Sequence, residues 1–102
     1  MKWIDAGLAD TLPDGEARSI AVGRHTVAVV RSGGDYFAIQ DICTHDGAPL
    51  TGGEIEGQEI ICPRHGARFC LRTGEALTPP AYEPVRVFAT KIENGRLWVR
   101  AD

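Results

Sequence analysis

Glycine and proline divide this chain into short segments, and that division constrains its fold more than any other feature. Twelve Gly and six Pro together make 18 of the 102 residues, and they lie between short β-branched runs instead of collecting in one linker. The clearest predicted strands are 19–22, 25–31 and 36–40. The last two flank Ser32-Gly33-Gly34-Asp35, whose glycines tolerate the positive φ of a hairpin turn. The pattern predicts an all-β protein.

A second hairpin is predicted near the end of the chain. The runs 85–92 and 96–99 flank Asn94-Gly95, which is the strongest short-range hairpin signal. In the first run, apolar and other side chains alternate, so that Val85 and Val87 fall on one face and Phe88 on the other. We therefore expect that neither face of this strand is fully solvated.

Length and charge exclude several classes of protein. A chain of 102 residues has room for one domain, predicted over 1–102, and its net charge of -3 argues against nucleic-acid binding. The longest uninterrupted apolar run, 26–30, is far shorter than the ~18 residues of a membrane span. Asp5 stands where the apolar part of a secretory signal would begin. We expect a cytoplasmic monomer without a membrane partner, whose three cysteines stay reduced.

Residues 41–82 differ from the rest and are expected to form a small lobe inserted into the β framework. They are poor in periodic apolar residues and hold four of the six prolines and all three cysteines. Two similar segments stand out, Cys43-Thr44-His45-Asp46-Gly47-Ala48 and Cys62-Pro63-Arg64-His65-Gly66-Ala67. Each has one thiol and one imidazole, which suggests two halves of one site.

Thiolate and imidazole ligands together select zinc or iron–sulfur chemistry, whereas magnesium and calcium prefer oxygen. Gly47 and Gly66 would let backbone amides approach sulfur without an intervening Cβ. A zinc-binding structural module fits less well, because the single residue between Cys43 and His45 is fewer than the two to four usual in zinc fingers. A third possibility is that these side chains are ordinary core or surface residues.

The two segments resemble the cluster-binding loops of Rieske [2Fe-2S] proteins, and the chain has the length of the Rieske-type ferredoxins. The resemblance implies the Rieske fold, an antiparallel sandwich-like base with a cluster-binding lobe at about 41–82. It implies one [2Fe-2S] cluster, with Cys43 and Cys62 on one iron and His45 and His65 on the other.

The resemblance also implies the surroundings of the cluster. Pro79 and Pro80 match the proline-containing loop that covers it. Ala48 and Arg64 stand where the high-potential members have a disulfide, and Ala67 stands where they have a serine that donates to a bridging sulfide. Fewer donors stabilise the reduced cluster less, so we expect a reduction potential toward the low end of the family range, about −150 to +300 mV.

The implied function is a one-electron carrier and not an enzyme. Only His25 remains once His45 and His65 are assigned, which is too few for the mononuclear iron of a terminal oxygenase. The expected partners are an NAD(P)H-dependent flavoprotein reductase and a terminal aromatic-ring oxygenase, which dock near His45 and His65. A small Rieske subunit of another oxidoreductase, of the nitrite reductase type, is the alternative. The predicted docking surface comprises Asp46, Ala48, Pro49, Leu50 and Arg64, and Cys70 is expected to pack under the lobe.

Overall fold

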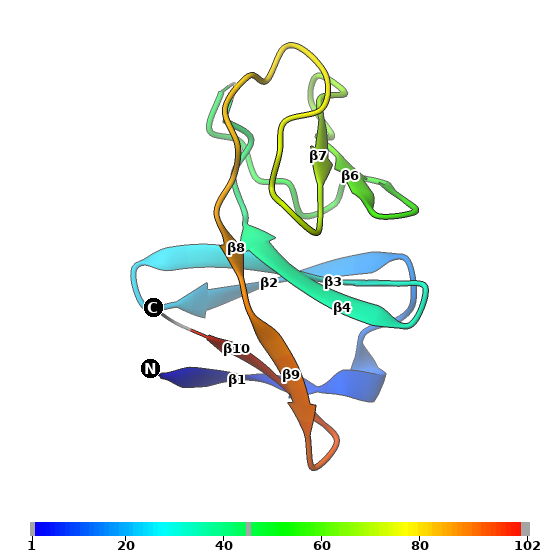
Figure 1. The fold of residues 1–102 in the computed structure, drawn as a ribbon, viewed down its shortest axis with the longest axis vertical. Helices are drawn as coiled ribbons and strands as arrows, with labels where there is room; N and C mark the ends of the chain where they lie inside the picture. Colours follow the sequence, from blue (N-terminus) through cyan, green and yellow to red (C-terminus); the bar gives the residue numbers. More distant parts are fainter. Residues whose placement is uncertain (1, 45, 101–102) are drawn as a thin grey trace.

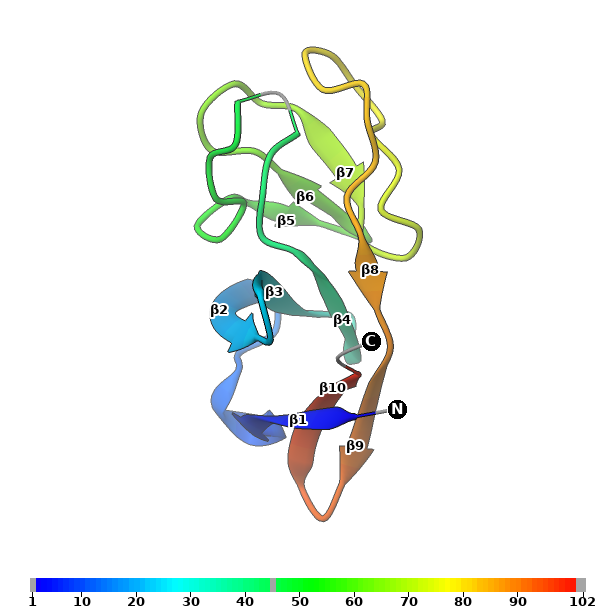
Figure 2. The ribbon, with the colours of Figure 1, turned by 90° about the vertical axis from the view of Figure 1, so that its left-hand side faces the viewer.

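The computed structural model describes residues 2–44 and 46–100, which form three antiparallel sheets (Figure 1). Two sheets make the base, and the third lies in a lobe at one end of the molecule (Figure 2). The elements are β1 (Trp3–Leu8), the 3-10 turn η1 (Ala9–Thr11), β2 (Glu16–Val22), β3 (His25–Ser32), β4 (Asp35–Gln40), β5 (Ile55–Glu56), β6 (Glu59–Ile61), β7 (Arg68–Cys70), β8 (Val87–Phe88), β9 (Thr90–Glu93) and β10 (Arg96–Arg100). The strand orders are β1-β10-β9, β2-β3-β4-β8 and β5-β6-β7. The all-β prediction is confirmed.

Strand β3 is the centre of the molecule because both of its faces are covered. Val27 and Val29 belong to the core between the two base sheets, whereas Ala28 and Val30 belong to the core beneath the lobe. All four side chains are fully buried. A strand buried on both faces needs a continuous apolar run, and this explains the uninterrupted sequence 27–30.

Both predicted hairpin turns are confirmed. Ser32 pairs with Asp35, and Gly33 and Gly34 between them have φ of 62° and 85°. At the second turn, Asn94 and Gly95 have φ of 54° and 75°. Two successive residues with positive φ match the right-handed twist of the flanking strands, which sets the register of each hairpin.

The predicted single strand 85–92 is wrong. The structure divides it at Ala89 into β8, which pairs with β4 of one base sheet, and β9, which pairs with β10 of the other. A segment that serves two sheets must bend between them. Phe88 is 8% and Val85 4% exposed, whereas Val87 is 39% exposed, so each of the two predicted faces of this segment buries one large apolar side chain.

The lobe is held by short strands of two or three residues and by turns. Phe69 of β7 is fully buried and packs with Leu50, Ile60 and Leu71 in the core beneath the lobe. The structure contains no helix, within residues 2–44 and 46–100, with the length and apolar character of a membrane span.

Candidate cluster-binding site

Cys43 and Cys62 lie in two turns with the same backbone hydrogen bonds. The Cys43 carbonyl accepts from Gly47 N at 2.7 Å, and Cys43 N donates to the Ala48 carbonyl at 2.6 Å. The matching bonds of the second turn join Gly66 N to the Cys62 carbonyl at 3.0 Å and Cys62 N to the Ala67 carbonyl at 2.7 Å. The two similar sequence segments therefore fold into two similar loops.

Glycine closes each of these turns for a conformational reason. Gly47 and Gly66 have φ of 78° and 75°, in the left-handed region that costs a side-chain-bearing residue about 1–2 kcal/mol. No atom lies within 4 Å of the position that a Cβ would take at either glycine. The requirement at both positions is thus one of backbone conformation, and the predicted role in approaching sulfur stays a prediction.

Both thiols of these turns are buried, and neither forms a disulfide. Cys43 is 0% and Cys62 is 1% exposed, and both belong to the core beneath the lobe, together with Leu50, Ala67 and Ala81. Buried thiols without a disulfide are available as metal ligands once deprotonated.

Asp46 joins the two loops at the surface. Its Oδ2 atom lies 3.2 Å from Nδ1 of His65 and 3.4 Å from Nε of Arg64, and its Oδ1 atom accepts from Ala48 N at 3.0 Å. The His65 side chain is 42% exposed. The other predicted imidazole ligand, His45, lies outside the described residues. A carboxylate from the first loop is therefore placed beside the imidazole of the second.

A buried carboxylate fastens the first loop to the base. Asp41 directly follows β4 and is 8% exposed. Its Oδ1 accepts from the backbone N–H groups of Leu50 and Thr51 at 2.7 and 2.8 Å, and its Oδ2 accepts from the Thr51 hydroxyl at 2.7 Å. Asp41 is not among the residues predicted from the sequence, although an acidic residue directly after a predicted strand was the available signal.

The proline-containing segment is hydrogen-bonded to the first loop and to the start of β7. The Thr78 hydroxyl accepts from Arg68 N at 3.0 Å, and the Thr44 hydroxyl of the first loop donates to the Glu83 carbonyl at 2.7 Å. Between these anchors lie Pro79 and Pro80, joined by a cis peptide bond. Their predicted role as a cover over the cluster stays a prediction, but the segment lies beside the first loop.

Two residues of the predicted docking surface are buried. Leu50 is 0% and Ala48 is 8% exposed, and Leu50 belongs to the core beneath the lobe. Their side chains therefore cannot form a docking surface, and that part of the prediction is wrong. Tyr82, which the sequence analysis did not select, is 80% exposed in the proline-containing segment. The sequence offered one indication that Tyr82 is exposed, which is its position outside every predicted strand.

Two further residues, Cys70 in β7 and His25 in β3, are not assigned to the cluster and lie outside the two turns. Cys70 is in β7 with its thiol partly exposed, and a hydrogen bond with the Thr73 side chain holds the pKa of that thiol below its usual value. Cys70 contributes little to the core, so the expected packing under the lobe is only partial. His25 begins β3, where its Nε2 lies 3.3 Å from Nη1 of Arg86. Since arginine can only donate, His25 accepts in this contact.

The residues present fit a two-iron cluster. Among the described residues, no three His, Cys, Asp or Glu side chains form a group that could hold a single metal ion. A Rieske cluster does not need such a group, because each of its irons takes two protein ligands, two Cys on one and two His on the other. The two buried thiols of the matching turns, neither of them in a disulfide, would supply the first pair, and His65 would supply one member of the second.

Comparison with known proteins gives a consistent result. The model of the Rieske [2Fe-2S] domain matches residues 2–89. The ferredoxin component of the naphthalene 1,2-dioxygenase/salicylate 5-hydroxylase systems of Ralstonia sp is 35% identical over 100 residues, which are 98% of this chain and 96% of that protein.

Two solved structures extend this likeness to the fold. The ferredoxin of carbazole 1,9a-dioxygenase from Nocardioides aromaticivorans IC177 has a TM-score of 0.95 at 30% identity, with all of both chains covered. A chain in a complex of reduced oxygenase and oxidized ferredoxin in carbazole 1,9a-dioxygenase has a TM-score of 0.92 at 33% identity, covering 98% of this chain and 94% of that one. The chain therefore belongs to the Rieske [2Fe-2S] family, as a ferredoxin that transfers electrons through an iron–sulfur cluster and is not itself an enzyme.

Proposed function

We propose that the chain carries single electrons to a terminal oxygenase through one [2Fe-2S] cluster. Cys43 and Cys62 would hold one iron, and His45 and His65 the other. The observation that carries this proposal is the pair of matching turns, each with a buried cysteine that forms no disulfide. When bound, the cluster supplies a centre that accepts and returns one electron. The chain's own residues contribute by holding the ligands, excluding water from the thiols and presenting the exposed His65 edge.

The proposed partners are an NAD(P)H-dependent flavoprotein reductase and a ring-hydroxylating oxygenase. The support is that a relative of 35% identity is the ferredoxin component of a dioxygenase system, and that a related ferredoxin has been solved together with its oxygenase. None of the three cysteines forms a disulfide, which suits a reducing compartment such as the cytoplasm. A role as a permanent subunit of another oxidoreductase would instead give a stable stoichiometric complex on purification.

We also propose a reduction potential toward the low end of the family range. The support comes from three side chains around the two turns. Ala67 is fully buried and has no hydroxyl to donate. Ala48 and Arg64 cannot form a disulfide, and Arg64 pairs with Asp46. With fewer donors toward the cluster, its added negative charge would be less stabilised.

Chemical analysis and voltammetry test the carrier function. The purified protein is expected to contain two iron and two acid-labile sulfide per chain, to absorb visible light, and to have a midpoint potential below 0 mV. A colourless protein with stoichiometric zinc would instead be the structural zinc module. A midpoint well above 0 mV would refute the low-potential proposal but leave the carrier function standing.

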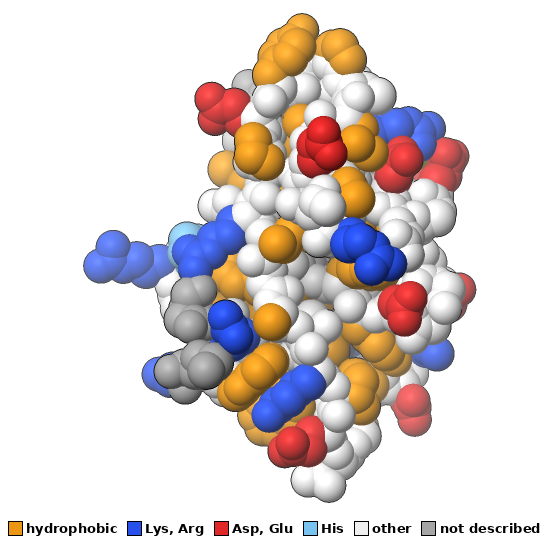
Figure 3. Space-filling view, viewed as in Figure 1, with side chains coloured by type: hydrophobic (Ala, Val, Ile, Leu, Met, Phe, Trp, Pro, Cys, Tyr) orange, Lys and Arg blue, Asp and Glu red, His pale blue; other side chains and the backbone are white. Residues whose placement is uncertain are grey.

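The proposed docking surface is the exposed end of the lobe. Hydrophobic side chains gather there (Figure 3), and Tyr82 is the most exposed large hydrophobic side chain of the described residues. The Thr44–Glu83 hydrogen bond places the neighbouring backbone beside the first loop. An exposed tyrosine adds large contact area with few rotatable bonds, which is typical of residues that dominate the binding energy of an interface.

Tyr82→Ala is expected to lower electron delivery to the terminal oxygenase of the naphthalene system by about tenfold at limiting carrier concentration. The reason is the loss of apolar contact at the centre of the docking surface. Leu8→Ala is the matched control, because Leu8 is 49% exposed but lies in β1 of the base. The measurement is the initial rate of substrate hydroxylation against carrier concentration. Equal losses in both variants would contradict a docking role for Tyr82.

A further inference from the structure

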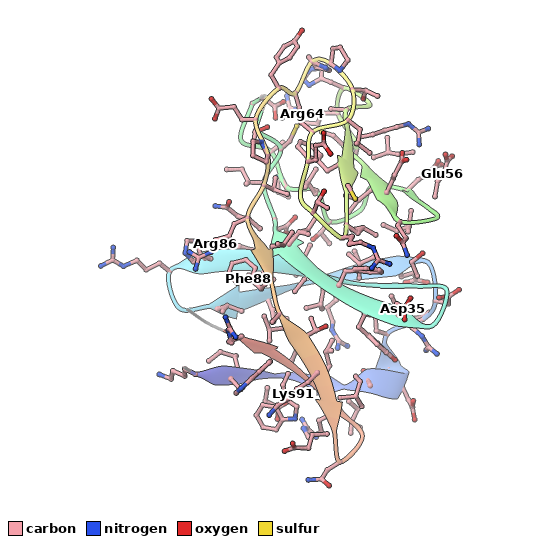
Figure 4. The ribbon with its side chains drawn as sticks, viewed as in Figure 1. Asp35, Glu56, Arg64, Arg86, Phe88 and Lys91 are labelled. Atoms are coloured by element: carbon pink, nitrogen blue, oxygen red, sulfur yellow. The ribbon has the colours of Figure 1, made fainter. Side chains whose placement is uncertain are left out.

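A basic cluster lies at the edge of the base next to the lobe. Arg24 is exposed in the turn between β2 and β3, and His25 follows it. Nη1 of Arg86 lies 3.3 Å from Nε2 of His25, and the Arg86 guanidinium carbon lies 5.1 Å from the centre of the Phe88 ring. Figure 4 shows Arg86 beside Phe88 at this edge. The Arg86 guanidinium is thus held in place by the imidazole of His25 and the ring of Phe88.

The charge of this cluster is positive, whereas the net charge of the chain as a whole is negative. The net charge is -3, yet Lys and Arg side chains gather along this edge in Figure 3, whereas many of the visible acidic side chains lie on the other side. Within residues 2–44 and 46–100, no carboxylate pairs with Arg24. A charge concentrated against the overall sign marks a surface that selects its partner by charge.

A groove leads from this cluster to the first cysteine loop. It has a volume of about 520 Å³, and its lining residues are Ser19, Arg24, His25, Thr26, Gln40, Asp41, Ile42, Gly47, Pro49 and Thr51. The carboxylate in this lining, that of Asp41, accepts three hydrogen bonds from Leu50 and Thr51. Its charge is therefore offset locally, and the basic mouth of the groove determines which ligands it attracts. Through Gly47 and Pro49 the groove reaches the loop that begins at Cys43.

We propose that this groove, with Arg24 in its lining and Arg86 beside its lining residue His25, receives an acidic segment of the redox partner. The proposal rests on the carrier function and adds the chemistry of the partner. An acidic segment at the cations would orient the partner over the exposed end of the lobe, because the groove ends at the first cysteine loop. Charges at the rim of an interface act mainly on the rate of association and on its salt dependence.

The test is an NMR titration of the ¹⁵N-labelled holoprotein with a hexaglutamate peptide at low salt. We expect shifts of the amide signals of 19–26, 40–42 and 86, and these shifts should vanish at high salt. Arg24→Glu should weaken peptide binding by about fivefold, and the double variant Arg24→Glu/Arg86→Glu by more than tenfold. Arg72→Glu is the matched control, since Arg72 is an exposed arginine of the lobe, outside the groove lining, and its substitution changes the net charge equally. Its effect should stay within twofold.

Three results would overturn the proposal. These are an equal loss of binding in Arg72→Glu, shifts centred on another part of the molecule, and hexalysine binding as tightly as hexaglutamate. The visible spectrum of each variant checks that the cluster is retained. Because peptide binding is measured apart from electron delivery, a protein without a cluster could still bind the peptide. Conversely, if the protein delivers electrons but Arg24→Glu binds the peptide as tightly as the parent, only the proposal of an acidic partner in the groove is refuted.

Discussion

Replacing Cys62 by serine is expected to abolish the visible absorption of the purified protein and to lower its iron content at least tenfold. A serine hydroxyl is not deprotonated near neutral pH, so the substitution removes an anionic ligand from a site that is 1% exposed. Even changes in residues around metal ligands cost about 10–100-fold in affinity, and a lost ligand should cost more. The measurements are iron per chain and the visible spectrum.

Cys70→Ser is the matched control for this experiment. It also removes one of the three cysteine thiols of the lobe, but Cys70 lies in β7, outside the two matching turns. It should keep the iron and the spectrum of the parent protein. Circular dichroism of both variants separates loss of the cluster from loss of the fold. If Cys62→Ser keeps its spectrum while Cys70→Ser loses it, the ligand assignment is wrong.

The features that could be predicted from the sequence are those written into neighbouring residues. Gly33-Gly34 and Asn94-Gly95 impose two successive positive φ angles, so each hairpin is specified by its own turn. The same holds for the cysteine turns, in which the bond from Gly47 N to the Cys43 carbonyl spans only four residues. Local chemistry determines these structures before any distant contact is made.

The features that were missed depend on residues far apart in the chain. The bend at Ala89 exists because β8 pairs with β4 and β9 with β10, which no alternation of side chains can indicate. Leu50 follows two candidate surface residues in sequence, but the bonds from its own and the next backbone N–H to Asp41 turn this part of the loop toward the base. Tyr82 is 80% exposed next to Glu83, whose carbonyl accepts a hydrogen bond from Thr44, 39 residues away.

A second large effect is expected at Gly74, which lies where the turn after β7 meets the chain returning from the lobe. Its N–H donates to the Cys70 carbonyl at 2.7 Å, and its carbonyl accepts from Val85 N at 2.9 Å. A Cβ at this position would lie 2.1 Å from the Val85 carbonyl oxygen and 3.1 Å from Cγ1 of Val87. Backbone cannot move aside as a flexible side chain can, so the returning segment would have to shift.

Gly74→Ala is therefore expected to lower the free energy of unfolding by about 3–5 kcal/mol, of which about 1–2 kcal/mol is the cost of its φ of 79°. Gly57→Ala is the matched control, because Gly57 has φ of 59° but no atom within 4 Å of a Cβ. Gly57→Ala should lose only the part of the unfolding free energy that comes from the positive φ, about 1–2 kcal/mol. Thermal unfolding of the holoprotein should give a Tm roughly 10 °C lower for Gly74→Ala than for Gly57→Ala. Equal Tm values would mean that the backbone at Val85 can move away from the new Cβ at little cost in free energy. The close approach of the two backbones at Gly74 would then not contribute to the stability of the fold.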